Sequence, residues 1–476
     1  MAAFDPAAAS IHAERMWAEE AVPVLRDYIR IPNVSPDYCP TWAEDGHMDR
    51  AVELVRGWCA GRPIPGLAVE VLRLPGRTPL LLVEVPSTGG GRDDDPVLLY
   101  GHLDKQPEMV GWRDGLGPWE PVVEGDRLYG RGAADDGYAV FAALGAIEAV
   151  RGAGGEHNRC VVLIEASEES GSPDLPAYFD ALADRIGTPG LVVALDSDST
   201  TYDRLWVTTS LRGIVVAVLD VQILTEGVHS GLAGGIVPSS FRILRRLLDR
   251  IEDSESGAVL LPEMHVDIPP ARAAQLGGLA ATMGDHARGF PLVSGARPQV
   301  ASPFDALVAS MWAPAVAVTG AEGLPGVGVA GNVLRPRTAV KLAIRVPPTC
   351  EAAAAARALV RALTADPPYG AQVGVRVEAA EDGWDAPADP VWLGSALDEA
   401  SRSTYGNPPA RTGVGGSIPF IAMLGRRFPS AAFVVTGVLG PGSNAHGPNE
   451  FLHLPTARRL TAAMAQVLHA HAVRPG

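Results

Sequence analysis

The chain has 476 residues, and because a single hydrophobic core stops growing beyond roughly 250–300 residues, we expect at least two domains. Its formal net charge of −16 repels a phosphate backbone, so the composition argues against nucleic acid as a partner. No apolar run is long enough to cross a bilayer, which argues against a membrane partner.

The N-terminal sequence and the cysteines favour a cytoplasmic protein. The first residues lack the basic region followed by an apolar run that marks a signal peptide. Cys39, Cys59, Cys160 and Cys350 lie far apart and form no close pair of the kind that binds metal or does redox chemistry. They fit thiols in a reducing compartment.

Residues 1–212 alternate helical stretches with short β-rich runs. Apolar spacing predicts helices over 6–30 and 137–151. The later apolar runs are near-continuous, which is typical of strands buried on both faces of a parallel sheet. This alternation favours an α/β core with helices on both faces. The predicted strands are Leu80–Val85, Val97–Tyr100, Val161–Ala166 and Leu191–Leu195.

Residues 213–382 have a different pattern, which predicts a small α+β domain inserted into the first. Two strand–helix alternations flank a Pro/Gly-rich stretch, 253–330, that we expect to be irregular. The predicted elements are the strand Ile214–Val221, a helix over 238–252, the strand Ala339–Val346, a helix over 350–365 and the strand Val373–Glu378. Residues 383–476 return to the α/β pattern, with helices over 390–404, 417–428 and 455–471 and a strand at Ala432–Thr436.

Five polar clusters follow predicted strands or loops at one edge of the α/β core, where open α/β sheets place their sites. His102 and Asp104 follow the second strand, and a carboxylate two residues away can orient an imidazole that binds metal. Asp135 and Asp136 stand in a Gly-rich turn before a helix. Alone, each pair has an ordinary structural explanation, as a His–Asp hydrogen bond or as a helix cap.

The other three clusters add acids and a second histidine. Glu168 and Glu169 come directly after a buried strand, where charged groups are costly unless they are paired or bind metal. Their side chains point in different directions, so one can bind metal while the other takes a proton. Asp196 and Asp198 follow the next strand, and His446 lies in a Gly-rich loop near the C-terminus.

Two histidines and several carboxylates from five segments predict a two-metal site. This donor mixture suits zinc, with manganese or cobalt as alternatives. Two divalent ions that share a carboxylate hold a hydroxide at neutral pH and polarise a carbonyl. A spare glutamate then serves as the general base. The residues therefore predict a di-metal hydrolase that cleaves an amide bond.

Read in order, these motifs resemble those of the di-zinc peptidase family of carnosinases, bacterial dipeptidases, aminoacylase-1, succinyl-diaminopimelate desuccinylase and glutamate carboxypeptidase. The similarity runs through nearly the whole chain. It rests on Tyr-Gly-His-Leu-Asp, Tyr-Gly-Arg-Gly-x-x-Asp-Asp, Glu-Glu-Ser-Gly-Ser, Ser-Leu-Arg-Gly, Val-His-Ser-Gly, Gly-Gly-Ser-Ile-Pro and Asn-Ala-His-x-x-Asn-Glu. The resemblance implies a phosphorylase/hydrolase-like zinc-peptidase catalytic domain in two parts, 1–212 and 383–476. It implies an inserted α+β, ferredoxin-like, lid/dimerisation domain at 213–382.

The resemblance also implies roles for the site residues. Asp135 would bridge two divalent ions, most simply Zn²⁺, with a cis peptide to Asp136. Glu168 would be the general base that deprotonates the bridging water, and Asp104 would orient His102 from behind. The remaining metal ligands would be His102 and Asp196 for one ion, and Glu169 and His446 for the other. We choose Asp196 over Asp198 because its spacing to Arg212 is that of the carnosinase-like branch.

Residues of the inserted domain would complete the site. In the family, the histidine equivalent to His229 reaches the active site of the other subunit and stabilises the tetrahedral oxyanion. By the same resemblance, Arg345 and Asn332 would bind the carboxylate end of the substrate. Gly416 and Ser417, at a helix start, would donate to the same carboxylate. The inserted domain would also hold a homodimer together.

Three hypotheses about function follow. The leading one is a dipeptidase acting on small peptide-like substrates, because an Asp rather than a Glu at position 196 is typical of the dipeptidase and aminopeptidase members. The second is a deacylase of the same fold that removes an acyl or succinyl group from an amino acid. The third is a catalytically silent metal-binding scaffold, which the presence of Glu168 argues against. One departure is that Gly137-Tyr138 replaces the Lys-Gly that follows Asp-Asp in many relatives.

Overall fold

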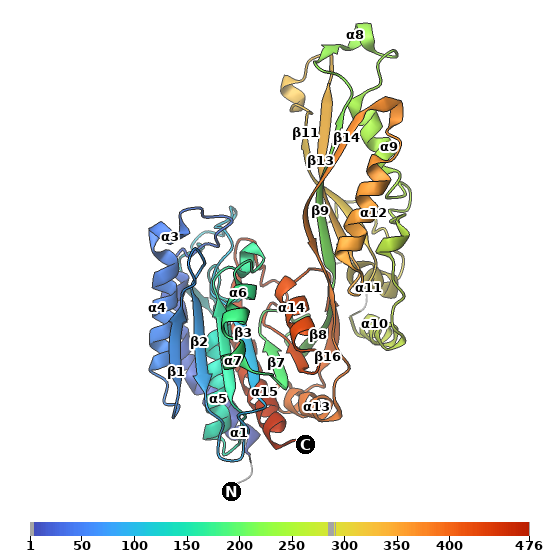
Figure 1. Cartoon of the computed structure of the whole chain (residues 1–476). Coiled ribbons are helices and arrows are strands. Elements are labelled where there is room, and N and C mark those ends of the chain that lie inside the picture. The colour runs from blue at the N-terminus through green and yellow to red at the C-terminus, as the bar shows by residue number, and fades with distance from the viewer. Residues whose placement is uncertain (1–3, 284–289, 291, 476) are drawn as a thin grey trace. The chain divides into compact units, whose positions relative to one another are not determined.

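The computed structural model describes residues 4–283, 290 and 292–475, which form two compact units (Figure 1). The first unit comprises 1–208, 386–411 and 423–476, and the second comprises 209–385 and 412–422. Residues 412–422 thus belong to the second unit, whereas the sequence predicted them to be part of the catalytic domain. The sequence-based domain boundaries stay a prediction.

The first unit contains the predicted α/β elements. Asp5 caps its first helix by accepting a hydrogen bond from the Ala7 amide at 2.9 Å, and Pro6 occupies the first helical position. The elements wholly within the unit are α1 (Pro6–Met16), a π-helical turn (Trp17–Ala21), α2 (Val22–Ile29), α3 (Trp42–Asp45), α4 (His47–Ala60), β1 (Ala68–Leu72), β2 (Leu80–Val85), β3 (Val97–His102), β4 (Val122–Glu124), β5 (Arg127–Tyr129), α5 (Ala139–Gly152), β6 (Cys160–Glu165), η2 (Glu168–Ser170), α6 (Leu175–Ala181), α7 (Ala183–Ile186), β7 (Leu191–Ala194), α13 (Val391–Tyr405), β17 (Ala432–Val435), β18 (Phe451–His453) and α15 (Leu454–Val473). Three elements, β8 (Trp206–Leu211), β16 (Ala410–Val414) and α14 (Pro419–Arg427), contain residues of both units.

The central sheet of this unit has the order β1-β2-β6-β3-β7-β17, followed by β8. Strands β6, β3, β7 and β17 are parallel, as the apolar runs predicted. The parallel pattern does not extend to the edge, because β2 pairs antiparallel with β6 and β1 antiparallel with β2. The sheet is therefore mixed.

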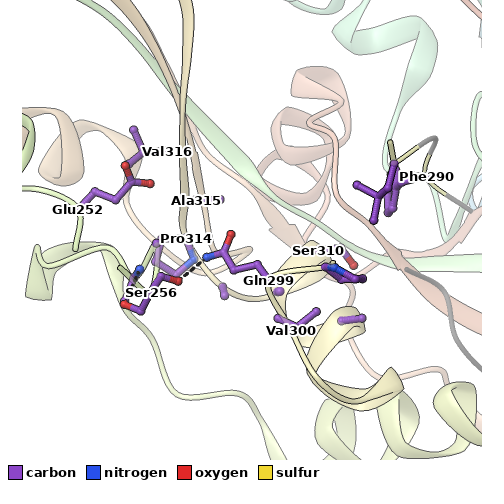
Figure 2. Close-up of a pocket in the computed structure, with 16 residues that line it drawn as sticks. Glu252, Ser256, Phe290, Gln299, Val300, Ser310, Pro314, Ala315 and Val316 are labelled. Carbon is purple, nitrogen blue, oxygen red and sulfur yellow. Dashed lines mark hydrogen bonds between the residues drawn. The ribbon is translucent and has the colours of Figure 1, made fainter. Parts of the chain in front are cut away.

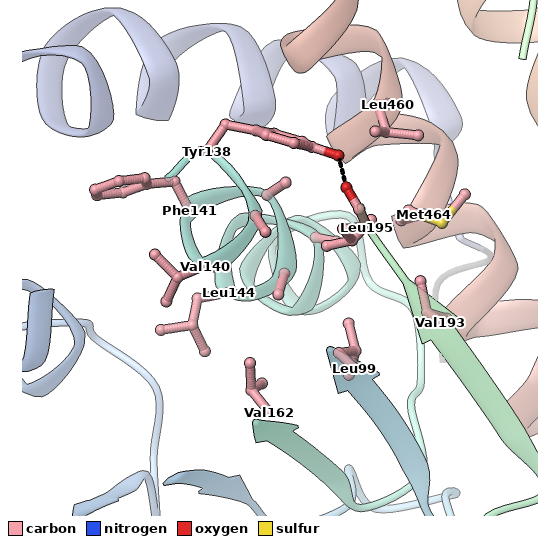
Figure 3. Close-up of a cluster of buried hydrophobic side chains, with 14 of the residues drawn as sticks. Leu99, Tyr138, Val140, Phe141, Leu144, Val162, Val193, Leu195, Leu460 and Met464 are labelled. Carbon is pink, nitrogen blue, oxygen red and sulfur yellow. Dashed lines mark hydrogen bonds between the residues drawn. The ribbon is translucent and has the colours of Figure 1, made fainter. Parts of the chain in front are cut away.

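Both faces of the sheet are buried, and α5 and α15 cover one of them. Leu99, Val162 and Val193 belong to a cluster of buried apolar side chains with α5 and α15, and Figure 3 shows them pointing toward α5. Leu98 and Leu163, whose side chains point to the opposite face, are equally buried. Burial on both faces explains why these strands are apolar without alternation.

The second unit has the chain order and sheet order of a ferredoxin-like domain. Its strands run β9 (Gly213–Gln222), β11 (Ala315–Glu322), β13 (Arg337–Val346) and β14 (Gln372–Glu381). Their order in the sheet is β11-β13-β9-β14, and all neighbours are antiparallel. The helices α9 (Ser240–Leu248) and α12 (Ala352–Thr364) pack on this sheet. The expected strand–helix alternation is thus present.

The expectation that 253–330 is irregular is wrong for much of the stretch. It contains α10 (Pro270–Met283), α11 (Pro303–Met311) and β11. Their small residues lower the contrast between apolar and polar positions, which hid the helical period. Residues 284–289 and 291 of the stretch lie outside the described residues. The remaining elements of this unit are β10 (Val228–His229), α8 (Ser230–Ala233), β12 (Val333–Leu334), β15 (Trp384–Asp385) and the short 3₁₀ turns Pro262–Met264, Val327–Val329 and Pro368–Gly370.

A cavity of about 470 Å³ lies within this second unit (Figure 2). Small apolar residues of α11 and the start of β11 line it, together with the polar side chains of Glu252, Ser256 and Gln299. The predicted metal ligands all belong to the first unit, so this cavity is not the predicted metal site. Among the helices of the described residues, none is long and apolar enough to cross a membrane.

Candidate metal centre

The parallel strands bring three of the predicted clusters to one edge of the sheet. His102 is the last residue of β3, η2 with Glu168 and Glu169 follows β6, and Asp196 comes two residues after β7. Because parallel strands end at the same edge, residues far apart in the sequence meet there. This edge is where the sequence predicted the site.

Two loops add the remaining residues. Asp135 lies in the turn between β5 and α5, and His446 lies in the loop between β17 and β18. The peptide between Asp135 and Asp136 is cis, as the resemblance implied. The Asp136 carboxylate accepts a hydrogen bond from the His102 amide at 3.1 Å, which connects this turn to the end of β3.

The ligand atoms form two groups that share Asp135. In the first ligand group, His102 Nε2 lies 3.2 Å from Asp135 Oδ1 and 3.9 Å from Asp196 Oδ2. In the second ligand group, His446 Nε2 lies 3.0 Å from Asp135 Oδ2 and 3.2 Å from Glu169 Oε2. Each oxygen of Asp135 therefore faces one imidazole.

These residues fit a pair of divalent metal ions. At zinc–ligand distances of about 2.0–2.2 Å, two tetrahedral ligand atoms lie about 3.3–3.6 Å apart, close to the separations found in both groups. Glu169 supplies a second observation: its Oε1 atom is buried and has no hydrogen-bond partner among the described residues. A buried carboxylate oxygen without a donor is costly, and a cation removes that cost. Imidazole and carboxylate donors in this mixture suit zinc, manganese or cobalt.

The candidate metal centre contains more acidic groups than basic ones, and burial and hydrogen bonds shift their pKa values. Burial raises the pKa of Asp196 to about 7, and burial together with the charge of Asp196 raises the pKa of Glu168. Burial acts on Asp135 in the same direction, but hydrogen bonds from His102 and His446 outweigh it and lower the pKa of that carboxyl. Burial lowers the pKa of His446, yet its hydrogen bonds to Asp135 and Glu169 raise the value to about 11. The site thus places four carboxylates beside only two imidazoles, and divalent cations would balance the excess negative charge. The carboxylates are those of Asp135, Glu168, Glu169 and Asp196.

Asp104 connects both sides of the centre from behind. His102 Nδ1 lies 3.1 Å from the Asp104 backbone oxygen and 3.4 Å from its carboxylate. The same carboxylate accepts hydrogen bonds from the amides of Glu168 at 3.0 Å and Glu169 at 2.9 Å. Asp104 therefore holds the turn that carries both glutamates, a role that the sequence did not indicate.

The choice between Asp196 and Asp198 agrees with the geometry. Asp196 is 8% exposed and lies near His102 and Glu168. The Asp198 side chain is exposed. The ligand-type atoms around His102 form two clusters, one with Glu168 and Asp196 and one with Asp135 and Glu169, and Asp198 belongs to neither.

The glycine that replaces the usual lysine after Asp135-Asp136 has a steric reason. A Cβ atom at Gly137 would lie 2.4 Å from Cε1 of Tyr28 and 2.6 Å from the carbonyl oxygen of Gly132. A buried lysine is nevertheless present nearby. Lys105 Nζ lies 3.9 Å from the centre of the Tyr28 ring and donates to the carbonyls of Tyr28 at 2.8 Å and Ile31 at 2.7 Å. These carbonyls lie at the end of α2, where they accept hydrogen bonds from the N–H groups of Lys105, whose pKa burial lowers well below its usual value.

Several supporting residues received no role from the sequence. Gln106 donates to Glu169 Oε2 at 2.6 Å, and Ser35 donates to the Asp104 carboxylate at 2.6 Å. Nothing in a single sequence marks these two. Arg131 and Glu450 form a buried ion pair between the two ligand loops, which are the loops that carry Asp135 and His446. Both stand in motifs that carry the resemblance, and a charged residue inside a Gly-rich loop is the signal that could have identified them.

The other predicted site residues lie in the second unit, in two places. Val333 pairs with His229, and the carbonyl of the neighbouring Asn332 accepts a hydrogen bond from the Ser230 amide at 2.9 Å. Arg345 donates to Ser417 Oγ at 3.0 Å. Gly416 and Ser417 precede α14 by a few residues and do not begin it.

Comparison with known proteins assigns the chain to a family. A sequence model of the family described as Peptidase family M20/M25/M40 matches residues 98–470. A cysteinylglycine-S-conjugate dipeptidase of Corynebacterium striatum is 30% identical over 384 residues, which cover 79% of this chain and 81% of the relative. The chain therefore belongs to peptidase family M20/M25/M40, and the metallopeptidase class expected from the sequence is confirmed.

Solved structures share the fold. The di-peptidase Dug1p from Saccharomyces cerevisiae superposes with a TM-score of 0.76 at 20% identity, covering 99% of both chains. Human carnosine dipeptidase 1 superposes with a TM-score of 0.74 at 21% identity, covering 98% of both chains. These likenesses confirm the predicted α/β peptidase fold.

Proposed function

We propose that the protein is a metal-dependent dipeptidase that hydrolyses the amide bond of dipeptides or similarly small substrates. The observation that carries the proposal is the pair of ligand groups that share Asp135, with Glu168 beside them. The dipeptidase relative that is similar over four-fifths of its length supports the substrate class.

In this proposal, His102, Asp135 and Asp196 would hold one divalent ion, and Asp135, Glu169 and His446 would hold the other. When bound, the ions would polarise the scissile carbonyl and the attacking water. Glu168 serves as the general base, because its Oε2 lies 3.9 Å from His102 Nε2 and its side chain stays 14% exposed, within reach of substrate. Asp104 keeps His102 and the Glu168 turn in place.

Arg345, Gly416 and Ser417 bind the C-terminal carboxylate of the substrate. The guanidinium of Arg345 and the hydroxyl of Ser417 are already in contact and present donors side by side. Charge-assisted hydrogen bonds of this kind recognise carboxylates well. A free C-terminus is therefore a requirement for the substrate.

His229 and Asn332 act in the site of a second copy of the chain. His229 directly precedes α8, which Figure 1 shows past the ends of β11, β13 and β14. It belongs to β10, which pairs with β12 just before the Arg337 end of β13, whereas Arg345 lies near the other end of β13. At roughly 3.4 Å per residue, the strand between Arg337 and Arg345 spans about 27 Å, and a dipeptide spans only about 7 Å. One substrate bound to Arg345 therefore cannot reach His229 of the same chain, whereas a homodimer lets a partner's histidine approach it.

The edge of the second sheet supports a homodimer. β11 pairs with β13 on one side, and in the described residues no strand pairs with its other side. Six of its eight residues are exposed and Glu322 is its sole charged residue. An exposed edge with little charge is a surface on which another chain can pair.

We also propose that the native ions are zinc and that the protein is cytoplasmic. The two-histidine donor set favours zinc, and manganese or cobalt can take the same positions. All four cysteines are free, which suits a reducing compartment.

The test is hydrolysis of a panel of dipeptides and N-acyl amino acids by metal-stripped protein refilled with zinc, manganese or cobalt. We expect cleavage of dipeptides that depends on added metal and is lost when the C-terminus is amidated. Glu168→Gln should lower kcat by about 10²–10⁴-fold while the protein still binds two ions. Cleavage of the N-acyl amino acids alone would identify a deacylase, and no turnover with two ions bound would favour the silent scaffold.

A further inference from the structure

A buried ion pair lies beside the candidate metal centre and outside the ligand set. Arg131 Nη1 lies 2.7 Å from Glu450 Oε2, and the two side chains are 1% and 0% exposed. Charges removed from water to this degree need full compensation from their neighbours. The partners of each charge therefore indicate what the pair holds together.

Those partners belong to the two ligand loops. The Glu450 carboxylate accepts hydrogen bonds from the amides of Gly132 at 3.1 Å, Ala134 at 3.1 Å and Asp135 at 3.3 Å. Arg131 donates to the carbonyl of Gly447 at 2.8 Å. One contact thus ends on the amide of the shared ligand Asp135, and another ends on the residue after the ligand His446.

The backbone conformation of the loop that carries His446 depends on contacts with the rest of the structure, such as the hydrogen bond from Arg131. His446 has φ = 63°, and Asn444 and Asn449 have φ = 54° and 62°. Residues other than glycine avoid this left-handed region unless the surrounding structure holds them there. The His446 side chain is 55% exposed, so packing around the imidazole contributes little to its position.

We propose that Arg131 and Glu450 are positioning residues for the second ligand group. The pair holds the backbone of both ligand loops and thereby keeps His446 Nε2 3.0 Å from Asp135 Oδ2. His102 of the first ligand group is held mainly by Asp104 and Asp136. The pair therefore controls the affinity for one of the two ions more than for the other. The inference rests on the proposed metal centre and not on the substrate.

Calorimetric titration of metal-stripped protein with Co²⁺ tests this inference. His446→Ala assigns one of the two binding events to the second ligand group. Glu450→Gln keeps the shape of the side chain but removes its charge and places an amide N–H against backbone N–H donors. We expect Glu450→Gln to weaken the second-group event about tenfold or more, as loss of an outer hydrogen-bond partner does in other metal sites. The first-group event should change by less than about threefold, and the visible absorption of the bound Co²⁺ should change.

The matched control is Glu148→Gln in the same unit. Glu148 pairs with Arg62 at 2.5 Å, with side chains that are 4% and 6% exposed. Its ion-pair partners among the described residues, Arg62 and His12, lie outside the loops that carry Asp135 and His446. This variant should lower the melting temperature and leave both Co²⁺ affinities unchanged.

Wild-type affinity in both events for Glu450→Gln would overturn the proposal and leave the pair a purely structural one. If Glu450→Gln does not fold, Arg131→Lys keeps the charge, loses the fork of donors and carries the same expectation. The titration needs no substrate, so its outcome is independent of dipeptide hydrolysis.

Discussion

Asp104 has more contacts than the orientation of one imidazole requires. Its carboxylate accepts from the amides of Glu168 and Glu169 and from the hydroxyl of Ser35, while the His102 ring lies against it. A carboxylate can accept all of these hydrogen bonds, because it has two oxygens and several lone pairs. The residue therefore sets the relative positions of a predicted metal ligand and the predicted general base.

The substitution Asp104→Asn tests that role. An asparagine places an N–H₂ group against at least one backbone N–H, so the turn that carries Glu168 and Glu169 must shift. We expect kcat to fall by about 10–100-fold with the fold retained. Steady-state kinetics and metal content of the purified variant provide the measurement. Ser35→Ala, which removes a single donor to the same carboxylate, should have a smaller effect, and a wild-type kcat for Asp104→Asn would show that the contacts are dispensable.

Single residues also show what the sequence could predict and what it could not. His102, Asp135, Asp196 and His446 were recognisable because their motifs have characteristic residue types in a characteristic order. The pairing of the supporting residues with one another was not recognisable, because the partner of Glu450 lies 319 positions away along the chain. Such contacts exist only after the sheet has formed. The lack of space for a side chain at Gly137 could not be predicted for the same reason, since it depends on the ring of Tyr28.

At the scale of elements, prediction succeeded where burial produces a strong pattern. The strands β6 and β7 and the helices α5 and α15 were predicted within two residues at each end, because continuous apolar runs and helical spacing are unambiguous there. The helices α10 and α11 were missed, because Ala, Gly and Pro obscure the contrast between faces. The antiparallel edge strand β1 was missed as well, since none of its side chains is fully buried.

The turn between α5 and β6 contains a buried histidine that makes this part of the fold sensitive to acid. His157 Nε2 accepts a hydrogen bond from Arg151 at 2.8 Å, and Nδ1 lies 2.7 Å from the carbonyl oxygen of Asn158. Burial lowers the pKa of His157 from 6.5 to about 4. Between these values the unfolded chain binds a proton that the folded chain does not. The free energy of unfolding is therefore unaffected by this histidine's titration above pH 6.5 and decreases as the pH falls toward 4.

We therefore expect His157→Gln to have a shallower dependence of unfolding free energy on pH than the wild type. The difference between pH 7 and pH 4 should amount to roughly 3 kcal/mol. Urea unfolding in the presence of EDTA, repeated at several pH values, provides the measurement. Comparison of the two proteins at pH 8, where the histidine is neutral in both states, isolates any loss that is independent of pH. Parallel curves for the two proteins would contradict the assignment.

At the scale of the whole molecule, the proposed active site needs two copies of the chain. The two groups of predicted substrate contacts lie near opposite ends of β13, one with His229 and one with Arg345. Within a single second unit, this separation exceeds the length of a dipeptide. In the proposed function the oxyanion histidine therefore comes from a partner, and we expect activity to depend on dimer formation.

Mixed dimers distinguish this arrangement from one in which His229 serves its own chain. Glu168→Ala and His229→Ala should each be nearly inactive alone, the latter by about 10²–10³-fold. Co-expression with two different affinity tags allows purification of the dimer that contains one copy of each. In that dimer the chain with intact Glu168 faces a partner with intact His229, so one of two sites is complete and about half of the wild-type activity should return. Dimers made of one variant in both tagged forms are the control. If the mixed dimer is as inactive as its parents, His229 acts within its own chain. An active His229→Ala parent would instead show that His229 has no catalytic role.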